Sequence, residues 1–126
     1  MRVFLSAKIR KQEFGRAVSQ EDLSVIARTA RIALGVRIAG KGLPPGTQLI
    51  KAYGTSPSGP KRVIYLLAVG DGDLFLLFYR DKNDPIGRNA SPANPAFRSA
   101  LQKHLVLLEE DIASANIDEL LLPDMP

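Results

Sequence analysis

The sequence predicts a small α+β domain, in which N-terminal helices precede a small antiparallel β-meander and a C-terminal helix packs on the sheet. Three stretches, residues 48–54, 61–69 and 74–80, are apolar, rich in β-branched and aromatic side chains and bounded by turn residues, which is typical of strands. Apolar residues recur at helical spacing before and after them. The length of 126 residues predicts one domain, residues 1–126, with the C-terminal helix and tail from about residue 95.

The first helix is expected from residue 7 to about residue 17, with Ile9 and Phe14 as core contacts. It follows residues 3–6, which form either a short first strand or a lead-in segment.

The second helix is expected to begin after Ser19, because Asp22 follows three residues later at the spacing of a helix cap. Gly35 is its expected C-terminal stop. The apolar residues of this helix share one stripe: Leu23, Ile26, Ala27, Ala30, Ala33 and Leu34.

Turn residues separate the strands of the meander, which is expected to have three or four strands. Residues 40–46 contain two prolines and three glycines and should form a loop, and residues 55–60 separate the first two strands. Asp71-Gly72 is a strong hairpin signal, because Gly72 tolerates the positive φ of a tight turn. Since the strands are apolar at nearly every position, we expect both faces of the sheet to be covered.

A polar connection, residues 81–93, leads to the C-terminal helix. Asn94 is its expected cap and Pro95 its first residue. Acidic residues 109–111 lie in its last turn, where they oppose the helix dipole or meet a basic surface. Residues 117–122 are expected to add one short turn before Pro123. The apolar stripe of the helix consists of Phe97, Leu101, Leu105, Leu108 and Ile112.

Composition excludes several classes of function. The chain has no cysteine, which rules out a disulfide scaffold and thiol chemistry. With one histidine and with Asp71 and Asp73 expected in a turn, neither a metal site nor a cofactor is expected. His104 lies beside the apolar stripe, which favours a partly buried helix residue over a catalytic base. With neither a signal peptide nor a membrane-spanning run in the sequence, we expect a cytoplasmic protein with no membrane partner.

Charge is unevenly distributed along the chain. Residues 1–62 contain twelve Lys and Arg against three Asp and Glu, a net charge of +9, whereas residues 63–126 contain five against ten, a net charge of −5. An electropositive surface is therefore expected on the N-terminal half and the first strands. The alternative is that the basic residues only keep the helices soluble.

Four cations lie within the strands or at their ends. Lys51 is mid-strand, Arg62 begins the second strand, and Arg80 and Lys82 end the third. Antiparallel pairing should bring Arg62 close to Arg80 or Lys82, and like charges side by side indicate an anionic ligand. Arginine binds phosphate through two parallel hydrogen bonds. Such groups could stabilise the transition state when RNA is cleaved by its own 2′-hydroxyl, a reaction that requires no metal.

Several short motifs stand in a fixed order over residues 3–90. They are Phe14 with Ser19-Gln-Glu-Asp-Leu23, then Leu49-Ile-Lys51, Ser58-Gly59, Lys61-Arg-Val-Ile-Tyr65 and Phe78-Tyr-Arg-Asp-Lys-Asn83. In this order they resemble the RelE/ParE superfamily of toxins from type II toxin–antitoxin systems, in particular its RelE/HigB-like branch. The resemblance implies a RelE-like sheet whose concave side grips nucleic acid, and cleavage of mRNA bound to the ribosome. It also implies a cognate antitoxin as partner. The expected assembly is either a homodimer of this chain or a toxin–antitoxin hetero-oligomer.

The resemblance implies roles for single residues. Arg62 matches the strand-start arginine that stabilises the scissile phosphate, Lys51 a strand lysine for phosphate binding or proton transfer, and Lys82 the basic residue after the last strand. These three are the expected catalytic residues. The other cations expected to bind RNA are Lys61, Arg80, Arg88, Arg28 and Arg31.

One departure from the family leaves alternatives open. Many ribonuclease members have a Tyr or His near the position of Lys82, whereas this chain has Arg88 and no nearby histidine, and Tyr79 lies inside a strand. The general acid or base is therefore unidentified. A ParE-like inhibitor of DNA gyrase, or a non-catalytic nucleic-acid-binding domain of the same fold, is the alternative function.

Overall fold

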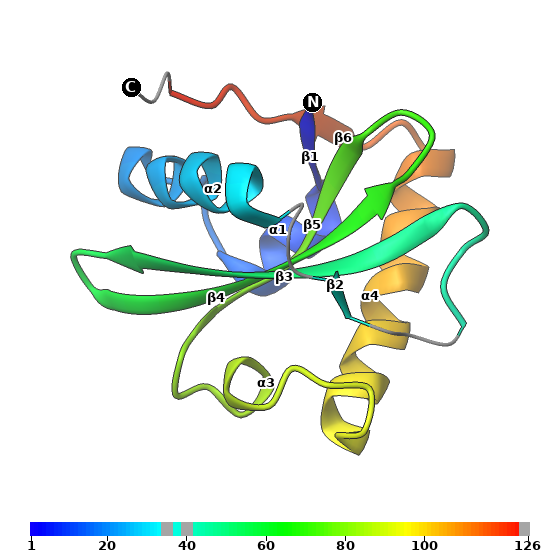
Figure 1. Cartoon of the computed structure of the whole chain (residues 1–126). Coiled ribbons are helices and arrows are strands. Elements are labelled where there is room, and N and C mark those ends of the chain that lie inside the picture. The colour runs from blue at the N-terminus through cyan, green and yellow to red at the C-terminus, as the bar shows by residue number, and fades with distance from the viewer. Residues whose placement is uncertain (34–36, 39–41, 124–126) are drawn as a thin grey trace.

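The computed structural model describes residues 1–33, 37–38 and 42–123, and Figure 1 shows a sheet with helices on both sides. The elements, in chain order, are β1 (Val3–Ser6), α1 (Ala7–Glu13), α2 (Gln20–Ala33), β2 (Arg37–Ile38), β3 (Thr47–Ser56), β4 (Gly59–Ala68), β5 (Asp73–Asp81), α3 (Pro85–Arg88), α4 (Pro95–Ala113) and β6 (Ile117–Glu119). The predicted α+β class is confirmed.

The sheet of the described chain has six strands in the order β2-β3-β4-β5-β1-β6. β3, β4 and β5 form the predicted antiparallel meander. The expected size and purely antiparallel pairing of the sheet are wrong, because β1 pairs in parallel with β5, with Val3 opposite Leu74. β6 then pairs antiparallel with β1 where one short turn was predicted, so the N-terminal strand lies between two later segments.

Both hairpins of the meander are tight. β3 and β4 run past the predicted apolar stretches until Ser56 lies opposite Gly59, which leaves only residues 57–58 between the two strands. The Asp71-Gly72 turn is present as predicted, with Gly72 at φ 73°. Because the pairing of β3 with β4 continues without a register shift, side chains alternate regularly between the two faces along this arm.

Helices cover both faces of the sheet, as predicted. On one face, the Tyr65 hydroxyl lies 2.8 Å from Thr29 Oγ1 of α2. On the other face, the ring of Phe78 lies against two residues of α4, with ring-centre distances of 5.5 Å to Phe97 and 4.4 Å to His104. Tyr65 and Phe78 are fully buried, so the meander forms the middle layer of a continuous apolar core.

The first helices are positioned by their caps. Ser6 Oγ accepts from the Ile9 N–H at the start of α1, and the buried carboxylate of Asp111 accepts from the Lys8 N–H. α1 ends at Glu13, earlier than predicted, because the chain turns at Gly15 with φ 68°. α2 begins at the predicted place; its stop at Gly35, and residues 39–41 of the predicted loop, lie outside the described residues.

One expectation for the C-terminal helix is wrong. Ile112 is 51% exposed, whereas its neighbour Asp111 is buried against α1 and accepts from the Lys8 N–H. The predicted polar connection contains a short helix, α3, capped by the Asp84 carboxylate. The Asn94 cap and the first residue of α4 are as predicted.

Candidate nucleic-acid interface

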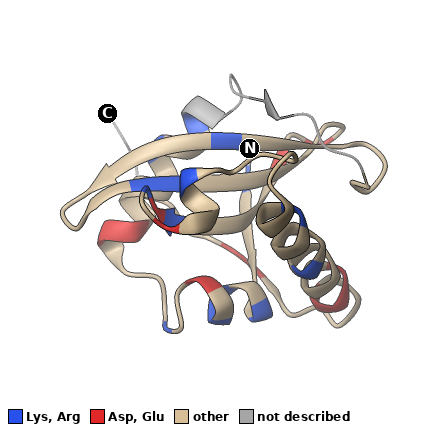
Figure 2. Cartoon of the chain, turned by 90° about the horizontal axis from the view of Figure 1, so that it is seen from below, with Lys and Arg blue, Asp and Glu red and all other residues tan. Residues whose placement is uncertain are grey.

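Alternation along the meander brings the three predicted catalytic residues to one face of the sheet. Tyr53 of β3 lies opposite Arg62 of β4, and Arg62 lies opposite Arg80 of β5. Lys51 precedes Tyr53 by two residues and shares its face. Lys82 follows Arg80 by two residues, and its backbone N–H still bonds across to Pro60. This face is the one that α3 and α4 cover in part, and Figure 2 shows the basic segments on neighbouring strands of the meander.

An open pocket of about 250 Å³ lies at the end of this face. The Arg62 guanidinium lies over the Tyr53 ring, 4.1 Å from its centre, and the Lys51 ammonium is 5.7 Å from the same ring. The lining contains no carboxylate; it consists of Tyr53, Gly54, Thr55, Pro60, Lys61, Arg62 and Lys82. A pocket with cations and no anion favours a negatively charged ligand.

The three cations of this face are not neutralised by the fold. Within the described part of the chain, Lys51, Arg62 and Lys82 form neither an ion pair nor a side-chain hydrogen bond. Their charges are therefore available to an external anion. We call Lys51, Arg62 and Lys82 the free cation set.

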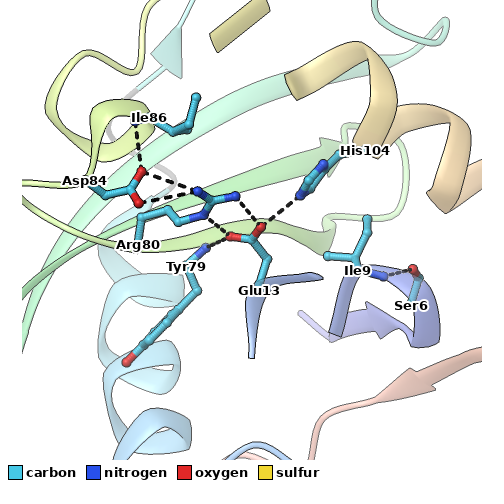
Figure 3. Close-up of polar contacts among 8 residues, drawn as sticks. All are labelled: Ser6, Ile9, Glu13, Tyr79, Arg80, Asp84, Ile86 and His104. Atoms are coloured by element: carbon cyan, nitrogen blue, oxygen red, sulfur yellow. Dashed lines mark hydrogen bonds and ion pairs between the residues drawn. The ribbon is translucent and has the colours of Figure 1, made fainter. Parts of the chain in front are cut away.

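Arg80 differs from its neighbour Arg62, because its charge is paired inside the protein. Its guanidinium donates two hydrogen bonds to Glu13, of 2.7 and 2.8 Å, and approaches Asp84 at 3.3 Å (Figure 3). The Glu13 side chain is completely buried, and its carboxylate also accepts from the Tyr79 N–H at 2.8 Å. Arg80 thus ties β5 to α1, and its role as an RNA ligand stays a prediction.

Glu13 is the centre of this buried network. Burial alone would raise the pKa of its carboxyl, but hydrogen bonds from Arg80, from His104 and from the Tyr79 N–H outweigh burial and hold the pKa below its usual value. His104 Nε2 lies 2.9 Å from Glu13, and its Nδ1 is buried with no hydrogen-bond partner among the described residues. His104 is more deeply buried than predicted and does not line the pocket beside Tyr53.

The remaining cations predicted to bind RNA are dispersed. Lys61 alternates to the opposite face, where its ammonium pairs with Asp81. Arg28 of α2 donates a hydrogen bond of 2.8 Å to the Thr55 carbonyl, and Arg31 is exposed on the same helix. Arg88 is exposed at the end of α3. Lys61 nevertheless lines the pocket with Arg62 and Lys82, and Arg28 is bonded to another lining residue, Thr55.

A second pocket, of about 270 Å³, lies on the Lys61 side of the sheet. Its charged groups are already paired: Arg16 with Asp22, Lys61 with Asp81, and Arg80 with Glu13 and Asp84. The Tyr79 hydroxyl donates to Asp22, and burial together with this carboxylate raises the pKa of Tyr79. This pocket is therefore a weaker candidate for an anionic ligand. Its lining is Glu13, Phe14, Arg16, Asp22, Ser58, Lys61, Tyr79, Arg80, Asp81 and Asp84.

The described residues contain neither a metal-binding cluster nor a membrane-spanning helix. Over residues 1–33, 37–38 and 42–123, no group of three or more His, Cys, Asp or Glu side chains could hold a metal ion. Over the same ranges, every helix is too short or too polar to cross a membrane.

Two residues of the site were missed by sequence reasoning. Tyr53 could have been found from strand alternation, since it stands two residues after Lys51 on the same strand. Glu13 gave no local signal, because its partners lie about 66, 67 and 91 positions away in the sequence.

Comparison with protein-family models, with curated proteins and with solved structures found no significant match to the chain.

Proposed function

We propose that the protein is the toxin of a type II toxin–antitoxin system and inhibits translation by ribosome-dependent, metal-independent cleavage of mRNA. The observation that carries this proposal is the free cation set, Lys51, Arg62 and Lys82, on one sheet face beside an open pocket without carboxylates. The small α+β architecture with a β-meander is compatible with the RelE-like fold that the sequence resembles.

The proposed reaction is attack of a ribose 2′-oxygen on the adjacent phosphorus. The new O2′–P bond forms as the P–O5′ bond breaks, the 2′-hydroxyl loses its proton, and the leaving 5′-oxygen gains one. Negative charge builds on the phosphoryl oxygens in the transition state, and Arg62 stabilises it with two parallel N–H donors. Lys82 holds the neighbouring phosphate, and Lys51 binds phosphate or transfers a proton.

An antitoxin would act on the same face. Covering Lys51, Arg62 and Lys82 with acidic side chains would neutralise the free cation set and exclude RNA. Such a partner would protect the cell that produces the toxin. It would also supply the counterions that the three cations do not have within the described chain.

The test is inducible expression in a bacterial host, with growth followed alongside primer-extension mapping of abundant transcripts. We expect growth arrest and new 5′ ends inside translated regions, both lost with Arg62→Ala. Arg98→Ala is the matched control, because it removes the same charge from the exposed surface of α4, away from the pocket. Arg62→Lys should recover only part of the activity, since it keeps the charge without the two-pronged donor.

The same experiment separates the alternatives. Growth arrest with intact transcripts would overturn the proposed ribonuclease activity and favour inhibition of DNA gyrase. Absence of arrest, with the protein folded and abundant, would leave a non-catalytic nucleic-acid-binding domain.

A further inference from the structure

Tyr53 is an aromatic side chain that the fold leaves uncovered. It is 48% exposed, although Leu49, four residues earlier on the same face of β3, is fully buried. α4 packs mainly against β1 and β5, and α3 packs mainly against β4 and β5, so the main contacts of both helices are with strands other than β3. The ring of Tyr53 therefore forms part of the surface of the pocket.

The other two tyrosines of the chain have internal partners. The Tyr65 hydroxyl is bonded to Thr29 and the Tyr79 hydroxyl to Asp22, and both rings are buried. The Tyr53 hydroxyl has no hydrogen bond to any described residue. Tyr65 and Tyr79 thus contribute to the core by packing and hydrogen bonding, whereas neither role accounts for a tyrosine at position 53.

Two cations without a carboxylate partner among the described residues lie close to the ring of Tyr53. The Arg62 guanidinium carbon is 4.1 Å from its centre and the Lys51 ammonium 5.7 Å, and neither cation has a carboxylate partner in the described chain. The site therefore offers a flat aromatic surface directly beside charges that suit phosphate. A nucleotide of a single strand presents both an accessible base and a phosphate, whereas a duplex keeps its bases stacked inside.

We propose that Tyr53 binds one unpaired nucleobase by stacking, while Lys51, Arg62 and Lys82 bind the adjacent phosphates. This subsite selects single-stranded over double-stranded nucleic acid and sets the position of the strand relative to Arg62. The identification of that strand as RNA rests on the proposed function, whereas the stacking itself does not.

The test measures binding by fluorescence anisotropy at fixed salt, with three labelled probes. The first is a single-stranded RNA of about eight nucleotides, within the usual range of single-strand sites. The second is an abasic strand of the same length, and the third is the corresponding duplex. The variants are Tyr53→Leu, which removes the ring, and Tyr53→Phe, which keeps it and removes the hydroxyl.

We expect Tyr53→Leu to weaken binding of the single-stranded RNA roughly fivefold to a hundredfold, the usual effect of losing one stacked base. Binding of the abasic strand should be unchanged, and Tyr53→Phe should behave as the wild type. Because Tyr53 is exposed, both variants should keep the wild-type circular dichroism and melting temperature.

Equal weakening of the base-containing and abasic strands by Tyr53→Leu would overturn the inference, as would no weakening of either. Tyr53-dependent binding by a protein that cleaves no transcript would overturn the ribonuclease and leave the stacking subsite intact. Cleavage that is lost with Arg62→Ala but unchanged with Tyr53→Leu would overturn the subsite and leave the ribonuclease. A wild-type protein that binds no probe would overturn the stacking subsite, whereas ribosome-dependent cleavage would still be decided by the primer-extension experiment.

Discussion

At the scale of single residues, Glu13 makes the two arginines that face each other across β4 and β5 differ in charge pairing. Arg62 and Arg80 are direct cross-strand neighbours, so their charges would repel if both were free. Glu13 removes this conflict, because its buried carboxylate accepts two hydrogen bonds from Arg80. Arg62 is then left for an external anion, while Arg80 belongs to the scaffold.

Replacing the two arginines should therefore change the free energy of unfolding by very different amounts. Arg80→Ala leaves the Glu13 carboxylate buried without its main partner and should lower the free energy of unfolding by about 3 kcal/mol. Arg62→Ala should change it by less than about 0.5 kcal/mol, because Arg62 has no ion pair to lose within the described chain. Urea unfolding measures both. Equal losses of stability would contradict the assignment of Arg80 to the scaffold.

Glu13 should also make stability depend on acid pH. Its pKa is lower in the folded state than in the unfolded chain, where a glutamate has a pKa of about 4.3. The carboxylate therefore stabilises the fold above that pH, and this stabilisation is lost as the pH falls through the lower folded pKa. Glu13→Gln should be less stable at neutral pH and should lose less stability on acidification.

The measurement is the free energy of unfolding by urea between neutral pH and about pH 3, around the glutamate pKa. Glu21→Gln is the matched control, because Glu21 is exposed at the start of α2 and forms no ion pair with a described residue. It should keep the wild-type acid dependence. If Glu13→Gln kept that dependence as well, the result would contradict the prediction that the ionised Glu13 carboxylate stabilises the fold.

At the scale of elements, the sequence allowed the parts with local signals to be predicted. The meander, the Asp71-Gly72 turn and the approach of Arg62 to Arg80 or Lys82 follow from apolar stretches and turn chemistry over a few residues, and the structure places Arg62 opposite Arg80. The parallel pairing of β1 with β5 could not be predicted in this way, because it joins Val3 to Leu74 and depends on tertiary packing. β6 was missed for the same reason.

The same distinction applies to the candidate site. The resemblance of the sequence to RelE-like toxins, and not a spacing rule, singles out Lys51, Arg62 and Lys82. The pairing states of Lys61 and Arg80 could not be predicted, since Asp81 and Glu13 reach them through strand register and through the end of α1. The sequence therefore shows which cations exist, and only the fold separates the neutralised cations from the free ones.

The close packing of α3 against the end of β5 can be tested by substitution at Gly87. Gly87 of α3 is buried, and a Cβ atom there would clash with the Asp81 carbonyl oxygen and contact the Arg80 side chain. Gly87→Ala should therefore shift α3 and lower the free energy of unfolding by about 1–3 kcal/mol. Gly70→Ala is the control, because a methyl group there would point into open space, with no described residue beyond its chain neighbours within 4 Å. Thermal unfolding compares the two; a neutral Gly87→Ala would mean that α3 is not held in this position.

At the scale of the whole molecule, the distribution of charge follows from where the helices lie. α2 covers one face of β3 as far as Gly54, whereas the opposite face at the end of β3 and β4 carries Tyr53 and Arg62 with Lys51 beside them. The net charge of +4 is modest, so long-range attraction alone is a weak account of binding. The local feature that favours an anion is the grouping of Arg62 and Lys82 in one pocket beside Tyr53, with Lys51 near the same ring.

This arrangement predicts a shallow but definite salt dependence of RNA binding. Three phosphate contacts, made by Lys51, Arg62 and Lys82, should give a slope of about −2 for log K against log salt, since each contact to a single strand contributes about −0.7. Lys82→Ala should reduce the slope by about 0.7 and weaken binding of all single-stranded sequences alike. Lys103→Ala, at an exposed position of α4, should leave the slope unchanged. Anisotropy titrations at several salt concentrations measure these slopes. A slope that responds equally to Lys82→Ala and Lys103→Ala would indicate diffuse attraction by the whole surface and would contradict a localised phosphate site.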